Sequence, residues 1–429
     1  MSRPIAGKVP QRRWGIAVLL GFGILVSYFD RVNLSVSKEA LHDAFGMSPV
    51  LFGFLSSAYN WPYAVLQLPS GLLLDRFGVR RVGIVSTIIW AAASFAAAVS
   101  LGVKSLFGAR ILLGIGEAPT FPGTAKATGY WFAANERSLA TAMFDSMAKF
   151  SSAVGIPVLG MVLVHFGWRA NFALTGIISV IYLALFLKFY RNPSQDAGLS
   201  EIEREHIRNG GAQPEDPARA AAGAPLGYLI TRKKVLGLAL GYGSYNYVFY
   251  LLLTWLPAYL AEAHHLDLTR SFLYTSVPWL CATVAELTVG GWLVDSLIQR
   301  GWSATKVRQF VLVGGTSVGL CIFGVPYAHS APAAVAWIAF ALTGLSIAAP
   351  VGWSIPSLIA PRESVGTVGG IMNLSNQLSG IAAPIVTGFI VSATKNFQWA
   401  FLAAAAYLTI GIASYVLLLG EITPIPEPE

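Results

Sequence analysis

The chain has 429 residues, of which 55% are hydrophobic and only 12% are charged, and its mean hydropathy is +0.61. A soluble domain carries about 25% charged residues, so this composition excludes a soluble globule, a disordered chain and a secreted scaffold. The two cysteines, Cys281 and Cys321, both lie in apolar runs, which excludes a disulfide framework. We therefore expect an all-α protein that crosses a membrane many times.

Twelve apolar runs are long enough to cross a bilayer, which takes about 20 helical residues. They lie near residues 14–37, 50–74, 82–102, 105–132, 138–166 and 169–190, and then near 235–261, 271–294, 308–328, 331–358, 364–393 and 397–420. The long polar stretch 191–234 separates the two sets. This order predicts two six-helix bundles, residues 1–190 and 235–429, joined by a linker. Within the linker, Ser200 and Glu203 form a capping box, which predicts a short amphipathic surface helix over 200–209.

The basic residues predict the orientation in the membrane. If the amino terminus is cytoplasmic, most Lys and Arg residues fall on the cytoplasmic side, so the positive-inside rule places both termini there. This distribution explains the net charge of +8 without a nucleic-acid partner. Arg12 and Arg13 precede the first run, and Asp30 and Arg31 interrupt its far end, which favours a retained helix over a cleaved signal. Short outer loops favour a bacterial inner membrane.

A short repeat occurs where the second span of each half meets the cytoplasm. Gly, Leu and Asp recur with the same spacing in Gly71-Leu72-Leu73-Leu74-Asp75 and in Gly291-Trp292-Leu293-Val294-Asp295. We expect Gly71 to let helices approach closely and Asp75 to accept hydrogen bonds at a neighbouring helix amino terminus. Arg76, Arg80 and Asp295 complete the expected cytoplasmic gate, although each arginine alone is equally explained as a solvated charge. This repeat in a twelve-span chain resembles the Major Facilitator Superfamily, which implies two pseudo-symmetric halves.

Ionisable residues inside spans are costly and are functional candidates by default. Asp30 lies roughly 24 Å from the cytoplasmic side and Arg110 roughly 6 Å from the outer side, at about 1.5 Å per helical residue, so both lie at one level. We expect Asp30 to pair with Arg110, which leaves Arg31 free for an anion. Glu117 lies near mid-membrane without a neighbour of opposite charge on its own helix, which predicts a proton-binding carboxyl. The alternative is a permanent salt bridge between the first and fourth spans.

Three further spans carry charges. Asp145 and Lys149 are four residues apart, the spacing of an internal pair, and the alternative for Lys149 is a second anion-binding cation. We expect Lys126 to point toward the cytoplasm and Glu286 to make a gate or packing contact.

Two segments that contain these charged residues resemble one branch of the family more closely than the others. Tyr28-Phe29-Asp30-Arg31-Val32-Asn33 and Arg110-Ile111-Leu112-Leu113-Gly114-Ile115-Gly116-Glu117-Ala118-Pro119 resemble the anion:cation symporter branch, above all its proton symporters for D-galactonate and other sugar acids. The resemblance implies that Asp30 and Glu117 carry protons, that Arg110 pairs with the aspartate and that Arg31 binds the substrate carboxylate. It also implies sugar contacts at Tyr63 and Asn373. The sequence departs from the pattern at Lys149, where many sugar-acid symporters have Gln or Asn, and a lysine would favour a dianion.

Polar and aromatic residues complete the expected substrate site. Amides and hydroxyls beside an aromatic wall suit a polyol chain, although each aromatic alone is more often explained by packing or by the aromatic belt at the membrane interface. These residues are Tyr28, Tyr245, Asn246, Tyr250, Trp353 and Ser354, with Asn246 and Tyr250 on one helix face.

The expected function is therefore proton-coupled symport of a sugar acid (an aldonate, aldarate or hexuronate) by alternating access. The alternative is an exchanger or facilitator for an aromatic, dicarboxylic or sulfonated acid. No G-x-x-x-x-G-K-[ST] loop is present, which excludes an ATP-driven pump, and no histidine pair has ligand spacing within a span, which argues against an enzyme. We expect no cofactor or metal besides the coupling proton, and a monomer in the lipid bilayer.

Overall fold

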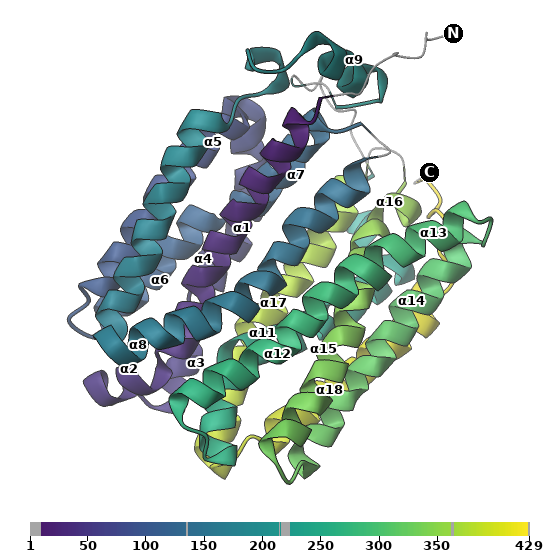
Figure 1. Cartoon of the computed structure of the whole chain (residues 1–429). Helices are drawn as coiled ribbons and strands as arrows, with labels where there is room; N and C mark the ends of the chain where they lie inside the picture. The colour runs from purple at the N-terminus through teal and green to yellow at the C-terminus, as the bar shows by residue number, and fades with distance from the viewer. Residues whose placement is uncertain (1–9, 134–135, 214, 216–223, 362–363, 428–429) are drawn as a thin grey trace.

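The computed structural model describes residues 10–133, 136–213, 215, 224–361 and 364–427, apart from the side chains of Leu68, Ser138, Asp295 and Gln299. Every regular element in this part of the chain is a helix. Most helices run roughly along one direction, and both termini lie at the same end as α9, opposite α2 (Figure 1). We call these two ends of the molecule the terminal end and the distal end.

The first bundle is built from eight helical segments. They are α1 (Arg12–Val36), α2 (Lys38–Phe45), α3 (Pro49–Ser57), α4 (Asn60–Val65), α5 (Gln67–Ala98), α6 (Val103–Glu117), α7 (Thr120–Trp131) and α8 (Arg137–Phe189). The linker contains a 3₁₀ turn, η1 (Pro193–Gln195), and two helices, α9 (Glu201–Asn209) and α10 (Leu226–Ile230).

The second bundle begins with α11, and its spans are extended by π and 3₁₀ segments. Its elements are α11 (Lys233–His264), α12 (Leu268–Ala285), η2 (Glu286–Leu293), α13 (Val294–Gln299), α14 (Ala304–Val318), η3 (Gly319–Tyr327), α15 (Ala331–Ser354), α16 (Pro356–Ile359), α17 (Val365–Thr394), α18 (Gln398–Ser414) and η4 (Tyr415–Leu419). The exact limits set for the two bundles remain predictions.

Two glycines divide helices that would otherwise be too long for a bilayer. The 53 residues of α8 would extend about 80 Å at 1.5 Å per residue, more than twice a bilayer core of about 30 Å. The helix is broken at Gly167, where φ is 79°, and α5 is broken in the same way at Gly78, where φ is 78°. Glycine adopts this left-handed φ without a steric penalty. Hence α8 supplies the fifth and sixth predicted spans, and α5 supplies the end of the second and all of the third.

Eight helical stretches of the described residues are long and apolar enough to cross a membrane by themselves. The other four predicted spans have identifiable reasons to be missed. The second is divided among α3, α4 and α5, the fourth is divided between α6 and α7, and the fifth and sixth share α8. The seventh, α11, is buried along most of its length, but its tyrosine, serine and asparagine residues make it less apolar. The expected architecture of twelve membrane-spanning helices in two six-helix bundles is therefore confirmed.

The two bundles are tightly joined at the distal end. The Ser35 hydroxyl of α1 donates to the backbone carbonyl of Thr254 on α11 at 2.8 Å, and Lys38 forms an ion pair with Glu262. At Gly53 of α3, an added Cβ would lie 2.5 Å from a backbone oxygen of α17, so the close approach of these helices needs glycine. In this conformation the site between the bundles is closed from the distal end.

At the terminal end, the linker helix α9 is anchored to the first bundle. The expected cap forms only in part, because Ser200 Oγ accepts from the Glu203 backbone N–H at 3.3 Å while the Glu203 carboxylate turns to Arg13. Glu203 is fully buried, and Arg13 also pairs with Glu136 at 2.8 Å. Burial acts to raise the pKa of Glu136, but hydrogen bonds from Arg13 and His206 outweigh it, so the pKa lies below its usual value. The helix is thus held by buried charges rather than lying freely on the surface.

Candidate functional site

A buried ion pair joins α1 to α6 near the centre of the first bundle. Arg31 donates from Nε and Nη2 to Oε2 of Glu117, at 3.3 and 3.2 Å. The Tyr59 hydroxyl donates to the same oxygen at 2.9 Å. Glu117 is fully buried, and its other oxygen, Oε1, has no hydrogen-bond partner within the described part of the chain. One carboxylate oxygen is therefore saturated, and the other remains available for a proton.

A glycine makes this geometry possible. An added Cβ on Gly114 of α6 would lie 2.2 Å from the Tyr59 carbonyl oxygen and 2.7 Å from Pro62. Gly114 thus leaves room on the face of α6 between Arg110 and Glu117, and Tyr59 and Pro62 fill this room. This close approach brings the Tyr59 hydroxyl to Glu117.

The Arg31 guanidinium lies within a cage of tyrosines. Its central carbon is 4.2 Å from the ring centroid of Tyr28, 4.7 Å from Tyr59 and 5.4 Å from Tyr63. Such contacts stabilise a desolvated cation through the ring quadrupole. The predicted site residues Tyr28 and Tyr63 therefore do lie at Arg31. Beside the guanidinium is a cavity that is lined from both bundles by side chains including Ser35, Asn60, Arg110, Tyr250 and Thr254.

Asp30 is held by hydroxyl groups instead of a direct ion pair. Ser94 on α5 and Ser179 on α8 donate to its two carboxylate oxygens at 2.6 and 3.4 Å. Arg110 lies beside Asp30 as expected, but its Nη1 donates to the backbone carbonyl of Asp30 at 3.0 Å. The Nε of Arg110 is buried without a partner among the described residues.

The predicted pairing therefore needs two corrections: Arg31 is not free, and Glu117 does have a cationic neighbour. Consecutive helical residues point about 100° apart, so Asp30 faces α5 and α8 while Arg31 faces α6. Arg110 and Glu117 are seven residues apart and share one face of α6. Once Arg110 reaches the backbone of Asp30, the same face brings Glu117 to Arg31. The depth estimate brought Asp30 and Arg110 together correctly, but it did not include the direction of each side chain around its helix.

A second buried charge cluster links the two bundles. The Lys149 ammonium lies 3.1 Å from Oδ2 of Asp145 and 2.8 Å from Oε2 of Glu286, which begins the π-helical segment η2. The side chains of Lys149 and Glu286 are 3% and 0% exposed. The predicted internal pair of Asp145 and Lys149 thus forms. Glu286, for which a gate or packing contact was expected, also forms an ion pair with Lys149 across the bundles.

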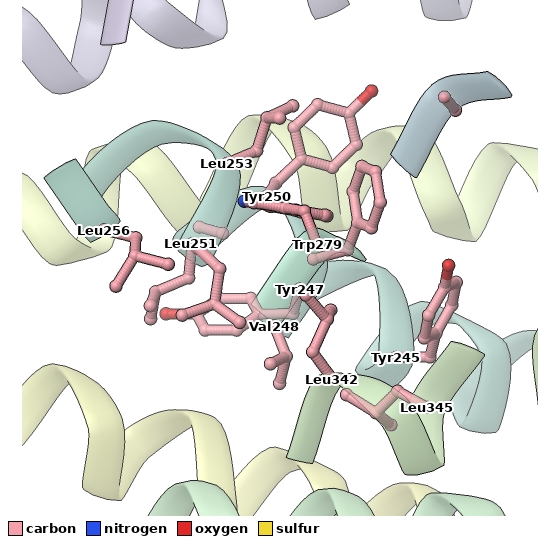
Figure 2. Packing of buried hydrophobic residues seen from close by; sticks show 14 of the residues in the cluster. Tyr245, Tyr247, Val248, Tyr250, Leu251, Leu253, Leu256, Trp279, Leu342 and Leu345 are labelled. Carbon is pink, nitrogen blue, oxygen red and sulfur yellow. The ribbon is translucent and has the colours of Figure 1, made fainter. Parts of the chain in front are cut away.

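Two tyrosines of α11 reach these two clusters. Figure 2 shows the hydroxyls of Tyr245 and Tyr250 pointing to the same side, away from Leu342 and Leu345. Tyr250 lines the cavity at Arg31 and interacts electrostatically with the guanidinium, while Tyr245 interacts in the same way with Lys149.

Other predicted residues of the second bundle lie farther from Arg31. Asn246 donates to the Asn376 carbonyl of α17 at 2.8 Å, and Tyr250 packs on Gly380 of the same helix, so the shared face of Asn246 and Tyr250 is confirmed. Asn373 donates to Gln67 of the first bundle at 3.1 Å.

Two predicted residues of α15 make contacts only within the second bundle in this conformation. Trp353 is 41% exposed and packs on Tyr242, which in turn packs on Tyr245. The Ser354 hydroxyl donates to the Val351 carbonyl of its own helix at 2.7 Å. Neither contact places these side chains at Arg31.

The expected gate near Gly71 differs in its contacts. Gly71 has no heavy atom within 4 Å of an added Cβ, so the close helix approach expected there is absent from this conformation. Asp75 forms an ion pair with Lys126 of α7 rather than capping a helix. The expectation that Lys126 points toward the cytoplasm stays a prediction.

The arginines that follow Asp75 also stay within the first bundle. Arg76 lies over the ring of Phe77, with its central carbon 5.3 Å from the centroid, and Arg80 donates to the Tyr190 carbonyl at 3.2 Å. The side chain of Asp295 is outside the described residues. The described gate residues therefore make no contact across the bundles in this conformation.

Several residues of the site were not predicted. Tyr59 precedes Tyr63 by four residues, a spacing that signals a shared helix face, but the break between α3 and α4 obscures it. The sequence does not single out Ser94 or Ser179, because serines within spans usually hydrogen-bond to their own helix. It does not single out Gln67 either.

The profile of the Major Facilitator Superfamily matches residues 20–384, and the chain belongs to this family. The chain is 38% identical to the Bacillus subtilis transporter YybO, over 98% of this chain and 97% of that protein. It is 30% identical to "Probable galactarate/D-glucarate transporter GudP" of B. subtilis (97% and 94% covered) and to the D-galactonate transporter of Escherichia coli O6:H1 (98% and 99% covered).

The fold also matches a solved structure at low sequence identity. It is a bacterial homologue of the human lysosomal transporter Spinster, in an inward-facing and occupied conformation, with a TM-score of 0.73, 15% identity and coverage of 96% and 97%. The chain is thus a multi-pass membrane transporter of the Major Facilitator Superfamily and not an enzyme.

Proposed function

We propose that this transporter is a symporter that couples uptake of a sugar acid to protons. The observation that carries the proposal is the buried pair of Arg31 and Glu117 at a cavity lined from both bundles. A cation that is already neutralised by a carboxylate binds a second carboxylate poorly. Protonation of Glu117 would release Arg31, which could then bind the carboxylate of the substrate.

This exchange conserves the charge of the buried site. With Glu117 ionised the pair is neutral. When Glu117 takes up a proton on its free oxygen, a substrate carboxylate replaces it at Arg31, and the pair is neutral again. Burying an unpaired charge costs several kcal/mol, so neither the proton nor the anion binds favourably without the other. Obligatory coupling of proton and anion follows from this electrostatic requirement.

Asp30 is the second proton carrier of the proposal. Its carboxylate depends on two hydroxyl groups for stabilisation, and the nearby Arg110 is bonded to its backbone. A hydroxyl can donate to the ionised carboxylate or accept from the protonated one, so Ser94 and Ser179 suit both states.

The surroundings of Arg31 suit a hydroxylated acid. Asn60 and Tyr250 place an amide and a hydroxyl group at the cavity, and the Tyr63 ring lies 5.4 Å from the central carbon of the Arg31 guanidinium. Asn373 with Gln67 offers an amide pair between the bundles. The names of the relatives GudP and the D-galactonate transporter support the same class of substrate.

The conformation is consistent with alternating access. The distal end is closed by contacts between the bundles, and the described gate residues at the terminal end contact only their own bundle. If both termini are cytoplasmic, as the basic residues predict, this is an inward-facing state of a monomer in a bacterial inner membrane.

The test uses purified protein in liposomes, with charge movement recorded on a solid-supported membrane. Aldonates, aldarates, hexuronates and aromatic carboxylates are applied at pH 6 and pH 8. We expect a transient for a sugar acid that is larger at pH 6 and absent in Arg31→Ala and Glu117→Gln. If folded protein responds to none of the sugar acids but exchanges another organic anion without charge movement, the proposal is wrong and the protein is an exchanger.

A further inference from the structure

Lys149 lies between two carboxylates and a tyrosine hydroxyl. Within the described part of the chain, its hydrogen bonds go to Asp145 at 3.1 Å and to Glu286 at 3.0 Å, and Tyr245 also hydrogen-bonds to it. An ammonium group has three N–H donors, so a further acceptor binds by replacing one of these partners. With both carboxyls ionised the cluster of Asp145, Lys149 and Glu286 carries a charge of −1, and the Glu286 side chain is 0% exposed.

The ionisable groups that face Glu286 come from α8 and α11. Lys149 and Asp145 face it from α8, and Tyr242 and Tyr245 interact with it electrostatically from α11. The helix α15 packs closely at Gly290, and its residues Ala331–Ser354 include no acidic or basic side chain. Lys149 is therefore the described cation that sets the protonation of Glu286.

The spacing of the two cation sites can be estimated along two helices. Tyr245 interacts with Lys149 and Tyr250 with Arg31, and five residues of α11 rise about 7.5 Å. On the other side, the Ser151 hydroxyl donates to the Leu25 carbonyl at 2.8 Å, which sets the register of α8 against α1.

Lys149 precedes Ser151 by two residues along α8, and Arg31 follows Leu25 by six residues along α1. The backbone levels of the two cations therefore differ by about 12 Å at 1.5 Å per residue. Along the helix axes, the levels of the two cation sites thus differ by about 7 to 12 Å.

A series of aromatic contacts runs from Tyr28, at Arg31, to Phe144, the sequence neighbour of Asp145. Tyr28 packs on Phe121 and Phe249 with ring centroids 6.4 and 6.2 Å apart, and Phe121 packs on Phe144, next to Asp145. A chain of carbon atoms that runs from Arg31 to Lys149 would pass along these rings. The extended chain of a six-carbon diacid separates its carboxyl carbons by about 6 Å, from five C–C bonds of about 1.5 Å. With about 3 Å from each carboxylate to its cation, this length matches the estimated spacing.

We propose that Lys149 is a second anion-binding group of the transport site and that it takes the distal carboxylate of a six-carbon dianion whose first carboxylate binds Arg31. Glu286 leaves Lys149 when this carboxylate arrives and takes up a proton from the side on which the substrate binds. The cluster then keeps its charge of −1, and the proton is released with the substrate on the other side. A dianion therefore moves with one more proton than the matching monoanion. This inference rests on the proposed function of the Arg31 site.

The test compares D-glucarate with D-gluconate, which share a carbon skeleton and differ by one carboxylate. Apparent Kd values come from thermal stabilisation of the purified protein, with Lys188→Gln as the control because Lys188 is an exposed lysine at the end of α8. In Lys149→Gln we expect glucarate affinity to fall by about tenfold to a hundredfold, the worth of a hydrogen bond to a charged group. Gluconate affinity should change by less than about threefold. Lys149→Arg, which keeps the charge, should retain part of the preference and serves if Lys149→Gln does not fold.

Uptake into liposomes tests the proton on Glu286. Between pH 6 and pH 8 both acids are fully ionised. In the unchanged protein, glucarate uptake should depend more steeply on pH than gluconate uptake, and in Glu286→Gln the two slopes should become equal. Equal loss of both affinities in Lys149→Gln, or unchanged slopes in Glu286→Gln, would overturn the proposal and leave the cluster a structural contact.

A failure of the Arg31 site gives a different result. If neither sugar acid binds, the proposed function is wrong. The apparent Kd values of adipate and hexanoate, the matching six-carbon diacid and monoacid without hydroxyls, are then compared in the same way. A preference for adipate that Lys149→Gln removes would still support the second site. The absence of any preference would overturn it as well.

Discussion

The hydroxyl of Tyr59 should set the pH range in which the transporter works. It donates to Oε2 of Glu117 at 2.9 Å, which stabilises the ionised carboxylate. A hydrogen bond to a charged group is worth about 1.5–3 kcal/mol, and one pH unit corresponds to about 1.4 kcal/mol. In Tyr59→Phe the ionised form loses this bond, so Glu117 binds its proton at higher pH. The midpoint of pH-dependent uptake should therefore move about 1 to 2 units toward alkaline pH.

The assay is uptake of the transported acid into liposomes over a series of external pH values. Tyr63→Phe is the matched control, because Tyr63 belongs to the same cage around Arg31 and its ring lies 5.4 Å from that of Tyr59. This control should leave the midpoint within a few tenths of a unit. An unchanged or acid-shifted midpoint in active Tyr59→Phe would refute the role given to Glu117. An equal shift in both variants would show that the cage acts as a whole.

Three further predictions concern the packing of the bundles and the linker. In Gly53→Ala the added Cβ would lie 2.5 Å from the Pro384 carbonyl oxygen, so the distal end should open. Spin labels on α3 and α17 should then report a longer distance between these helices. Gly370→Ala is the control, because the space around Gly370 is open, and it should leave this distance unchanged. Arg13→Gln leaves the buried Glu203 without its ion pair, which should lower the unfolding free energy by about 3–5 kcal/mol. Arg12→Gln is the control at a partly exposed pair and should lower it by about 1 kcal/mol or less. Equal unfolding temperatures in the two variants would contradict the role of Arg13. Because the pKa of Glu136 is lowered in the folded state, its contribution to stability is complete above the ordinary glutamate pKa of about 4.3 and is lost as the pH falls through the lower folded value. Protease cleavage near α9 should accordingly increase only in that acidic range, and cleavage that begins near neutral pH would contradict this assignment.

The overall architecture could be predicted because it depends on composition and run length. Twelve apolar runs, the polar linker and the repeat around Asp75 were sufficient for the fold class. The positions at which helices break within spans were harder to predict from the sequence. Gly78 and Gly167 end helices by a positive φ, and the fourth span is divided at Pro119, which has no backbone N–H to continue the helix.

The residues of the site were predicted better than their pairing. Charges inside a membrane are rare, so Asp30, Arg31, Arg110 and Glu117 were evident from the sequence. Their contacts depend on which way each helix is turned, and one residue along α1 changes the neighbour from Ser94 to Glu117. Contacts between the bundles could not be predicted from the sequence at all, because no spacing relates α8 to η2.

The most direct test of the central claim follows protons and substrate together in the same liposomes. A gradient of the transported sugar acid is imposed without a pH gradient, and internal pH and labelled substrate are recorded in the unchanged protein and in Glu117→Gln. Obligatory coupling through the Arg31 and Glu117 pair predicts that the substrate gradient drives protons inward, and that Glu117→Gln abolishes this proton flux while substrate exchange at equilibrium continues. Proton flux that persists in Glu117→Gln, or substrate uptake without proton flux in the unchanged protein, would contradict it.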